Sequence, residues 1–227
     1  METYAALRTR LRTRLDELTA HRWLDADLLQ KLYDGAKDVA RKSESLRKTS
    51  TIAGVAGTQS YTGPTDLIRV HRVTWKYASS PNVYPLEYRD FMSMDAVWWT
   101  QQTVAQQTPA LFTMWGSPPA LQLVLYPTPE AAGTITVYYY NLPADPATVA
   151  SVTCELPQGW EDCAIDYATY MCLLEDRDPM WQTHKALYEE HMSDLTITAQ
   201  RFSDQAGMIV PDGGVGAVPR FIWDENY

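Results

Sequence analysis

The stretch SYTGPTDLIRVHRVTWKY, residues 60–77, marks the point where this chain changes from helix to sheet. Its first part is a turn, because Gly63 and Pro64 interrupt regular structure. Its second part, Leu67–Tyr77, is rich in β-branched and aromatic side chains, which favour a strand. The chain follows helical patterns on both sides of this region, so the stretch indicates a β-rich insertion in a helical protein.

Three further strands are predicted downstream. They cover residues 111–115, 121–126 and 134–140, and the turn sequences GSPP and PTPEAAG separate them. Residues 87–107 have only weak helical periodicity, so we expect an inserted helix or a loop there. Residues 49–66 are punctuated by glycine and are expected to form a loop.

Apolar residues at three-to-four spacing predict two helices before the β region. The first covers residues 3–19, and the second runs from Asp25, a good N-cap, to about residue 47. We expect these two helices to form a hairpin. The apolar stripe of the first helix consists of Tyr4, Leu7, Leu11, Leu15 and Leu18.

Two more helices are predicted after the β region. Leu156 and Pro157 open the first of them, and Asp178 and Pro179 open the second. After Gln205 the chain becomes rich in Gly and Pro, which disfavours a regular helix or a central strand. We therefore expect an extended arm at the C-terminal end.

This order of elements predicts the α+β class. We expect a helical body of about four helices in antiparallel hairpins, an inserted small antiparallel β-domain and an extended C-terminal arm. The second hairpin is expected to pack on the first. The N-terminal hairpin covers residues 1–50, and the β-domain covers residues 51–153. The C-terminal hairpin covers residues 154–205, and the arm covers residues 206–227.

The composition is that of a soluble globular protein. Of the 227 residues, 45% are hydrophobic and 21% are charged, and a chain of this length can bury a core without disulfides or metal. It contains no apolar run of about 18 residues, and its N-terminus lacks the features of a secretion signal. The three cysteines, Cys154, Cys163 and Cys172, are expected to be reduced, buried thiols of a protein made in a reducing cytosol.

Charge is distributed unevenly along the chain. Residues 1–50 hold 11 Lys and Arg against 8 Asp and Glu, whereas residues 51–227 hold 8 against 20. This polarity could orient identical copies, or a copy and its partner, against each other. The alternative is that the charges are simply solvated faces of separate helices.

The sequence contains no specific signature of catalysis, a cofactor or a metal. His184 and His191 are seven residues apart, roughly 10.5 Å along a helix, which is too far for one ion without other ligands. The cysteines have neither C-x-x-C nor zinc-site spacing. The glycine-rich stretches at 53–57 and 213–216 lack the Lys-Ser/Thr of a phosphate-binding loop. We therefore predict no catalytic, cofactor or metal site.

Nucleic-acid binding has one weak argument in its favour. Arg69, His71, Arg72 and Lys76 lie in one predicted strand, but strand alternation places them on both faces. The net charge of −9 also argues against tight binding to duplex DNA. An acidic body could instead line a channel through which DNA slides.

Four blocks of the sequence resemble the podophage head-to-tail connectors, the portal–tail adaptor proteins of the tail tubular and tail accessory factor type. The block at 60–77 resembles their turn-and-strand segment, and GSPPALQLVLYPTPEAAGTITVYYYNLPADP (116–146) resembles the hairpin that follows it. LPQGWEDCAIDYATYMCLLE (156–175) and WLDADLLQKLYDGAKDVAR (23–41) are similar to their helices. Gly63 departs from the pattern, because the family usually has Leu before this Pro.

The resemblance implies a structural virion protein at the head–tail junction. It implies a ring of about twelve copies that matches the portal, binds below it and extends the channel through which viral DNA passes. It also implies a platform for the tail nozzle protein, with no cofactor, no enzymatic step and no membrane partner.

Two other functions remain open from the sequence. Tyr and Trp are abundant, 14 and 8 residues, and could stack on sugars in a carbohydrate- or receptor-binding module of a phage tail fibre. A fibre protein would usually have more strand and less helix. The less favoured alternative is a wall-degrading hydrolase that uses paired carboxylates, such as Glu189 and Glu190.

Large apolar side chains indicate three candidate contact sites. The helices would provide the interface between subunits, the β-domain would face the tail, and the arm would bind the portal or a neighbouring copy. The proposed subunit-interface residues are Trp160, Trp181 and Tyr188. The proposed tail-facing residues are Trp98, Trp99, Tyr138 and Tyr140. The proposed anchors of the arm are Phe221, Ile222 and Trp223.

Overall fold

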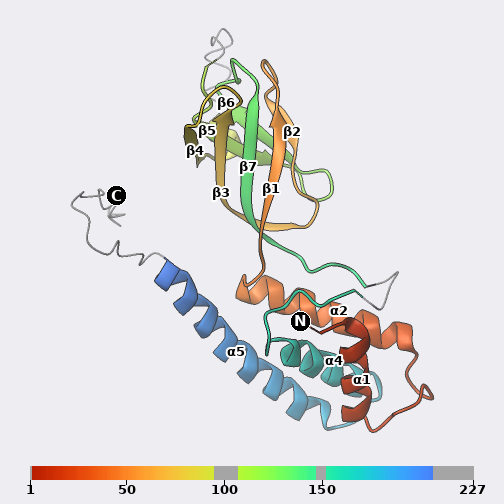
Figure 1. Cartoon of the computed structure of the whole chain (residues 1–227). Coiled ribbons are helices and arrows are strands. Elements are labelled where there is room, and N and C mark those ends of the chain that lie inside the picture. The colour runs from red at the N-terminus through yellow and green to blue at the C-terminus, as the bar shows by residue number, and fades with distance from the viewer. Residues whose placement is uncertain (1, 95–106, 147–151, 207–227) are drawn as a thin grey trace.

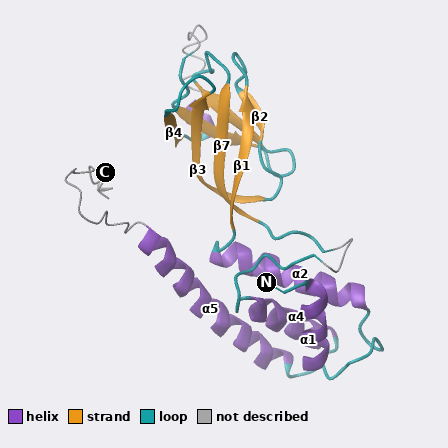
Figure 2. Ribbon diagram, viewed as in Figure 1, coloured by secondary structure: helices purple, strands orange, loops and turns teal. Residues whose placement is uncertain are grey.

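The computed structural model describes residues 2–94, 107–146 and 152–206. Helices gather at one end of the molecule and strands at the other, as Figure 2 shows by colour. The predicted α+β class is confirmed, because the β region is a single insertion between the helices of the N-terminal and C-terminal parts. Among the described residues, no helix is long and apolar enough to cross a membrane.

The helical body combines the two ends of the sequence. Its helices pack around one core, in which leucines of the first two helices meet small and aliphatic residues of the third. In Figure 1 the red and orange helices lie beside the teal and blue ones. The helices are α1 (Tyr4–Arg14), α2 (Asp25–Ser43), α4 (Glu161–Glu175) and α5 (Trp181–Ala206). Residues 91–94 are also helical.

The start and end of α2 differ from the sequence-based prediction. The N-cap is Leu24, and Asp25 is the first helical residue; its carboxylate binds Arg8 and Arg12 of α1 instead of capping the helix. The helix ends at Ser43, because Glu44 adopts a left-handed backbone conformation. The chain can therefore turn out of the body and begin a strand three residues later.

A glycine sets the distance between α2 and α4. A Cβ atom on Gly35 would lie 2.8 Å from the carbonyl oxygen of Ala164, so any larger residue would push the helices apart. This close approach lets Leu32 and Ala36 of α2 share a core with Ile165 of α4.

The β-domain is a seven-stranded sheet in the order β1-β7-β3-β4-β5-β6-β2. All strand pairs are antiparallel except β4 with β5. The four predicted strands are present, and three more were missed: β1, β2 and β4. The strands are β1 (Arg47–Gly54), β2 (Ser60–Thr62), β3 (Leu67–Tyr77), β4 (Val83–Tyr88), β5 (Leu111–Trp115), β6 (Gln122–Tyr126) and β7 (Gly133–Asn141).

Trp75 of β3 fills the centre of a second core, separate from that of the helical body. Its ring lies over two glycines, Gly133 on the adjacent strand β7 and Gly54 on β1 beyond it. A Cβ atom would lie 2.3 Å from the ring at Gly54 and 2.6 Å from it at Gly133. Because a side chain at either position would clash with the ring, this core depends on both glycines.

The helical body and the β-domain meet at a narrow junction. β1 leaves the body just after Leu46, and β7 returns to it at Asn141, whose amide donates to the carbonyl of Leu46. Beside this point the Asp66 carboxylate accepts hydrogen bonds from Lys48 at 2.7 Å and from Tyr139 at 2.8 Å. Burial opposes ionisation of Asp66, but these two donors lower the pKa of its carboxyl group.

Candidate functional site

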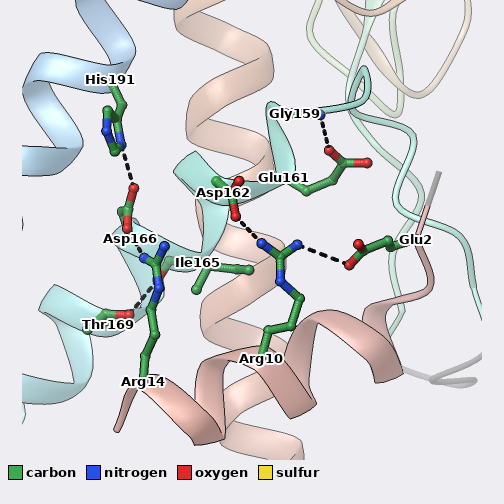
Figure 3. Close-up of polar contacts among 10 residues, drawn as sticks. All are labelled: Glu2, Arg10, Arg14, Gly159, Glu161, Asp162, Ile165, Asp166, Thr169 and His191. Atoms are coloured by element: carbon green, nitrogen blue, oxygen red, sulfur yellow. Dashed lines mark hydrogen bonds and ion pairs between the residues drawn. The ribbon is translucent and has the colours of Figure 1, made fainter.

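A line of ion pairs joins α1, α4 and α5 (Figure 3). Asp166 of α4 is buried, with 3% of its surface exposed, and it contacts Arg14 of α1. Its second carboxylate oxygen lies 2.7 Å from Nδ1 of His191 on α5. One turn earlier, Arg10 contacts both Asp162 and Glu2. These contacts hold the helices from the two ends of the chain together.

The same pairing extends along α2 and the loop before it. Lys31 of α2 contacts Glu175, and Arg22 lies 2.6 Å from Asp176. The basic N-terminal helices thus face acidic residues of α4 and its C-terminal cap. Part of the charge asymmetry in the sequence is therefore neutralised within one subunit, and fewer of these charges remain for orienting neighbouring copies.

The Asp166–His191 pair has the geometry of a base and its orienting carboxylate. To serve catalysis, such a pair needs a nucleophile on the other ring nitrogen. The hydroxyl of Thr169, on the same helix as Asp166, donates its hydrogen bond to the carbonyl of Ile165. The arrangement acts as a structural clamp between helices.

The three cysteines are free and buried. Burial raises the pKa of Cys163 to about 12 and that of Cys172 to about 12, and it also raises the pKa of Cys154. Their thiols stay protonated at neutral pH and are poor nucleophiles and poor metal ligands. In the part of the chain that the structure describes, no group of three or more His, Cys, Asp or Glu residues is placed to hold a metal.

The predicted subunit-interface residues differ in their surroundings. Tyr188 is 3% exposed, and its hydroxyl donates to the Asp38 carboxylate of α2, so it belongs to the core of its own subunit. Burial and the Asp38 carboxylate raise the pKa of this tyrosine. Trp160 and Trp181 are partly exposed, and Trp160 packs against the helical core. Only the two tryptophans retain surface that a neighbour could contact.

The predicted tail-facing tyrosines also differ. Tyr138 is 39% exposed, whereas Tyr140 is 6% exposed because the guanidinium groups of Arg47 and Arg69 lie over its ring. Tyr139, on the opposite face of β7, belongs to the core of the sheet. Trp98 and Trp99 lie outside the described residues, as do the arm anchors Phe221, Ile222 and Trp223.

Comparison with known families decides the identity of the chain. The sequence model of one family, described as "SU10 adaptor protein", matches residues 2–211. The chain belongs to this family of phage head–tail adaptors. The match covers both the helical body and the β-domain, and it confirms the predicted resemblance. No curated protein matches the chain significantly.

Membership in the adaptor family supports a structural role in the virion at the head–tail junction, with phage portal or tail proteins as partners. It favours this role over the tail-fibre module and the hydrolase considered from the sequence. The contact residues of an adaptor are surface side chains, so exposed apolar groups mark candidate contact sites.

Sequence reasoning missed one such group on the β-domain. Trp115, at the end of β5, is 58% exposed and lies against Phe91, with ring centroids 4.3 Å apart. Tyr88, at the end of β4, is 55% exposed and packs edge-on against Phe112. The run LFTMW ending in tryptophan was a possible signal, but strand alternation alone does not show which face of β5 is covered.

Proposed function

We propose that this adaptor forms a ring of about twelve copies that binds below the portal, extends the DNA channel and provides the platform for the tail nozzle. The observation that supports this most strongly is the two-ended shape of the subunit (Figure 1). The helical body and the β-domain have separate cores and meet at one junction. Copies side by side in a ring could therefore present the bodies to one partner and the β-domains to another.

The ring interface in this proposal involves the helices. Large apolar side chains on and between α4 and α5 are exposed, although each helix also buries one face in the core. A helix that exposes apolar surface in addition to the face it buries in its own core is suited to pack against a neighbouring subunit. These exposed residues are Leu174, Met180, Leu187 and Ile197, and the partly exposed Trp160 and Trp181 add to them.

The proposal is tested by mixing the purified chain with portal rings of the same phage. Native mass spectrometry should give portal rings carrying a full set of adaptor copies, about twelve in number. A portal that binds no adaptor at any concentration would contradict the proposal. Bound copies in another fixed number would contradict only the ring size.

The second expectation concerns DNA. If the acidic body lines a channel, the chain should have little affinity for duplex DNA at physiological salt, because its net charge of −9 repels phosphates. Fluorescence anisotropy with a labelled duplex should show no binding at about 200 mM salt. Binding that persists at this salt concentration would indicate a true nucleic-acid-binding protein instead.

The third expectation concerns the tail side. Replacing both Trp98 and Trp99 with Ser should leave portal binding unchanged and reduce addition of the nozzle protein by at least about tenfold, because aromatic anchors dominate interfaces. Co-sedimentation of portal–adaptor complexes with the nozzle protein measures this. Leu18→Ser, at an exposed position of the helical body outside the proposed ring interface, is the control and should leave both portal binding and nozzle addition unchanged. Loss of portal binding in the Trp98/Trp99 variant would indicate that the β-domain faces the portal, which is the opposite of the proposed orientation.

A further inference from the structure

One edge of β3 is only partly paired. β7 pairs with β3 from Leu67 to Tyr77, with register shifts at residues 68 and 71, but β4 pairs only with the second half, Val73–Lys76. β4 then diverges to pair with β5 at Glu87 and Tyr88. Among the described residues, no strand pairs with the β4-side edge of residues 67–72. An open edge of this kind offers backbone donors and acceptors to an added strand.

A cavity opens beside this edge, and we call the two together the β3 groove. The cavity has a volume of about 470 Å³ and lies between β3, β4 and β5. That volume is within the range of about 300–1,000 Å³ that is usual for ligand sites. The side chains that line it include Val70, Arg72, Leu86, Tyr88, Phe112 and Met114.

The groove is apolar inside and basic at its rim. Leu86 and Phe112 are buried below it, while Arg69, His71 and Arg72 of β3 are exposed around it. Glu44 neutralises part of this charge through its ion pair with Arg69. The groove therefore suits an extended segment that combines large apolar side chains with negative charge.

β1 of a neighbouring copy does not fit this description. It lies at the end of the sheet order, but it begins with Arg47 and Lys48. Pairing it with β3 would bring these cations toward Arg69 and Arg72, and like charges on facing strands are destabilising.

The C-terminal segment FIWDENY, residues 221–227, does fit. After residue 206 it lies in the longest run without Gly or Pro, and such a run can form a strand. In a strand, Phe221 and Trp223 share one face and could enter the cavity together. Asp224 and Glu225 then follow with two negative charges, opposite in sign to the rim.

We propose that residues 221–227 of a neighbouring copy add to the open edge of β3 as a further strand and place Phe221 and Trp223 in the β3 groove. This inference rests on the proposed function, in which the arm leaves its own subunit. It gives the arm a specific receptor on the next adaptor, so the ring would be joined by exchanged strands as well as by its helices.

A binding assay that needs no portal tests the groove. The full chain carrying Phe221→Ser, Ile222→Ser and Trp223→Ser leaves the groove free of its natural occupant. A fluorescent peptide of residues 217–227 should bind this chain with a Kd in the range of about 1–100 µM. Trp223→Ser in the peptide should weaken binding about 30-fold, as expected for a central aromatic anchor.

Groove variants make the assay specific. Arg72→Glu and Tyr88→Ser, both at exposed positions, should each weaken peptide binding about five- to tenfold. Lys76→Glu is the matched control, since it makes the same charge change on β3 outside the groove and should leave binding unchanged. No binding at about 1 mM peptide, or equal affinity for all these variants, overturns the proposal.

Cross-linking distinguishes a neighbouring copy from the same copy. Full chains carrying His71→Cys at the rim of the groove are mixed with full chains carrying Tyr227→Cys, which keeps both anchors, in the presence of portal rings, and oxidised. A disulfide-linked dimer is the expected product, and its absence overturns exchange between copies. Portal binding is scored separately, so adaptors that bind portals without cross-linking contradict only the groove, whereas failure to bind portals contradicts the proposed function.

Discussion

A chain truncated after Gln205 should unfold at the same temperature as the full chain and fail to remain on the portal. Both hydrophobic cores consist of residues that precede this point, and the last fully buried contributor is Met192 of α5. The truncated chain therefore keeps every buried core residue that the structure describes. It lacks Phe221, Ile222 and Trp223, each of which could contribute roughly 1.5–3 kcal/mol on burial, before the cost of ordering the arm.

Differential scanning calorimetry and gradient sedimentation with portal rings measure the two effects. We expect a change in Tm below about 2 °C and at least a tenfold loss of portal-bound adaptor, which corresponds to about 1.4 kcal/mol. The full chain with all three anchors changed to Ser is the control, and should behave like the truncated chain. A lower Tm would show that the arm folds back on its own subunit, and normal portal retention would show that it is not an anchor.

Trp75→Ala should destabilise the β-domain by about 3–5 kcal/mol and leave the helical body folded. The indole of Trp75 is fully buried between Gly54 and Gly133, so the substitution leaves a large cavity that two glycines cannot fill. The helical body keeps its own core, because no buried residue of that core belongs to the sheet; among the described sheet residues, only the partly buried Ile68 of β3 packs against it.

Hydrogen exchange resolved by segment measures this effect directly. Amide protection should fall in β3 and β7 and stay unchanged in α2 and α4. Trp115→Ala, at an exposed position in the same domain, is the matched control and should cost less than about 0.5 kcal/mol. An equal loss of protection in the helices would show that the two parts unfold as one unit.

The predicted strands and the missed ones differ in how they are buried. β3 and β7 were predicted because they are rich in β-branched and aromatic residues, and such residues, Trp75 and Val137 among them, are buried in the structure. β1 reads RKTSTIAG and is mostly exposed, since it lies at the end of the sheet, where polar side chains are favoured. β4 contains Pro85, which argues against a strand in any sequence-based assignment. Strands of these two kinds are specified by their partners more than by their own residues.

The contact sites were harder to predict than the fold. On α5, helical spacing alone does not show which apolar residues are buried: the core takes Tyr188 and Met192, whereas Leu187 is exposed. Tyr188 is held inside by Asp38, which is 150 residues away, and no local pattern reveals such a partner. The adaptor family was recognisable because its signal is the order of several blocks, which does not depend on the surroundings of any one residue.

The junction beside Leu46 and Asn141 has a mechanical consequence. β1 begins and β7 ends at the same end of the sheet, and the two are neighbours joined along eight residue pairs. A pull on the β-domain therefore draws both strands in the same direction, so neither has to slide past the other. The β-domain would move as a rigid unit on its two adjacent connections to the helical body, and it would tilt more readily than it would shear. In a ring, the β-domains could tilt outward together while the helical bodies stay in place.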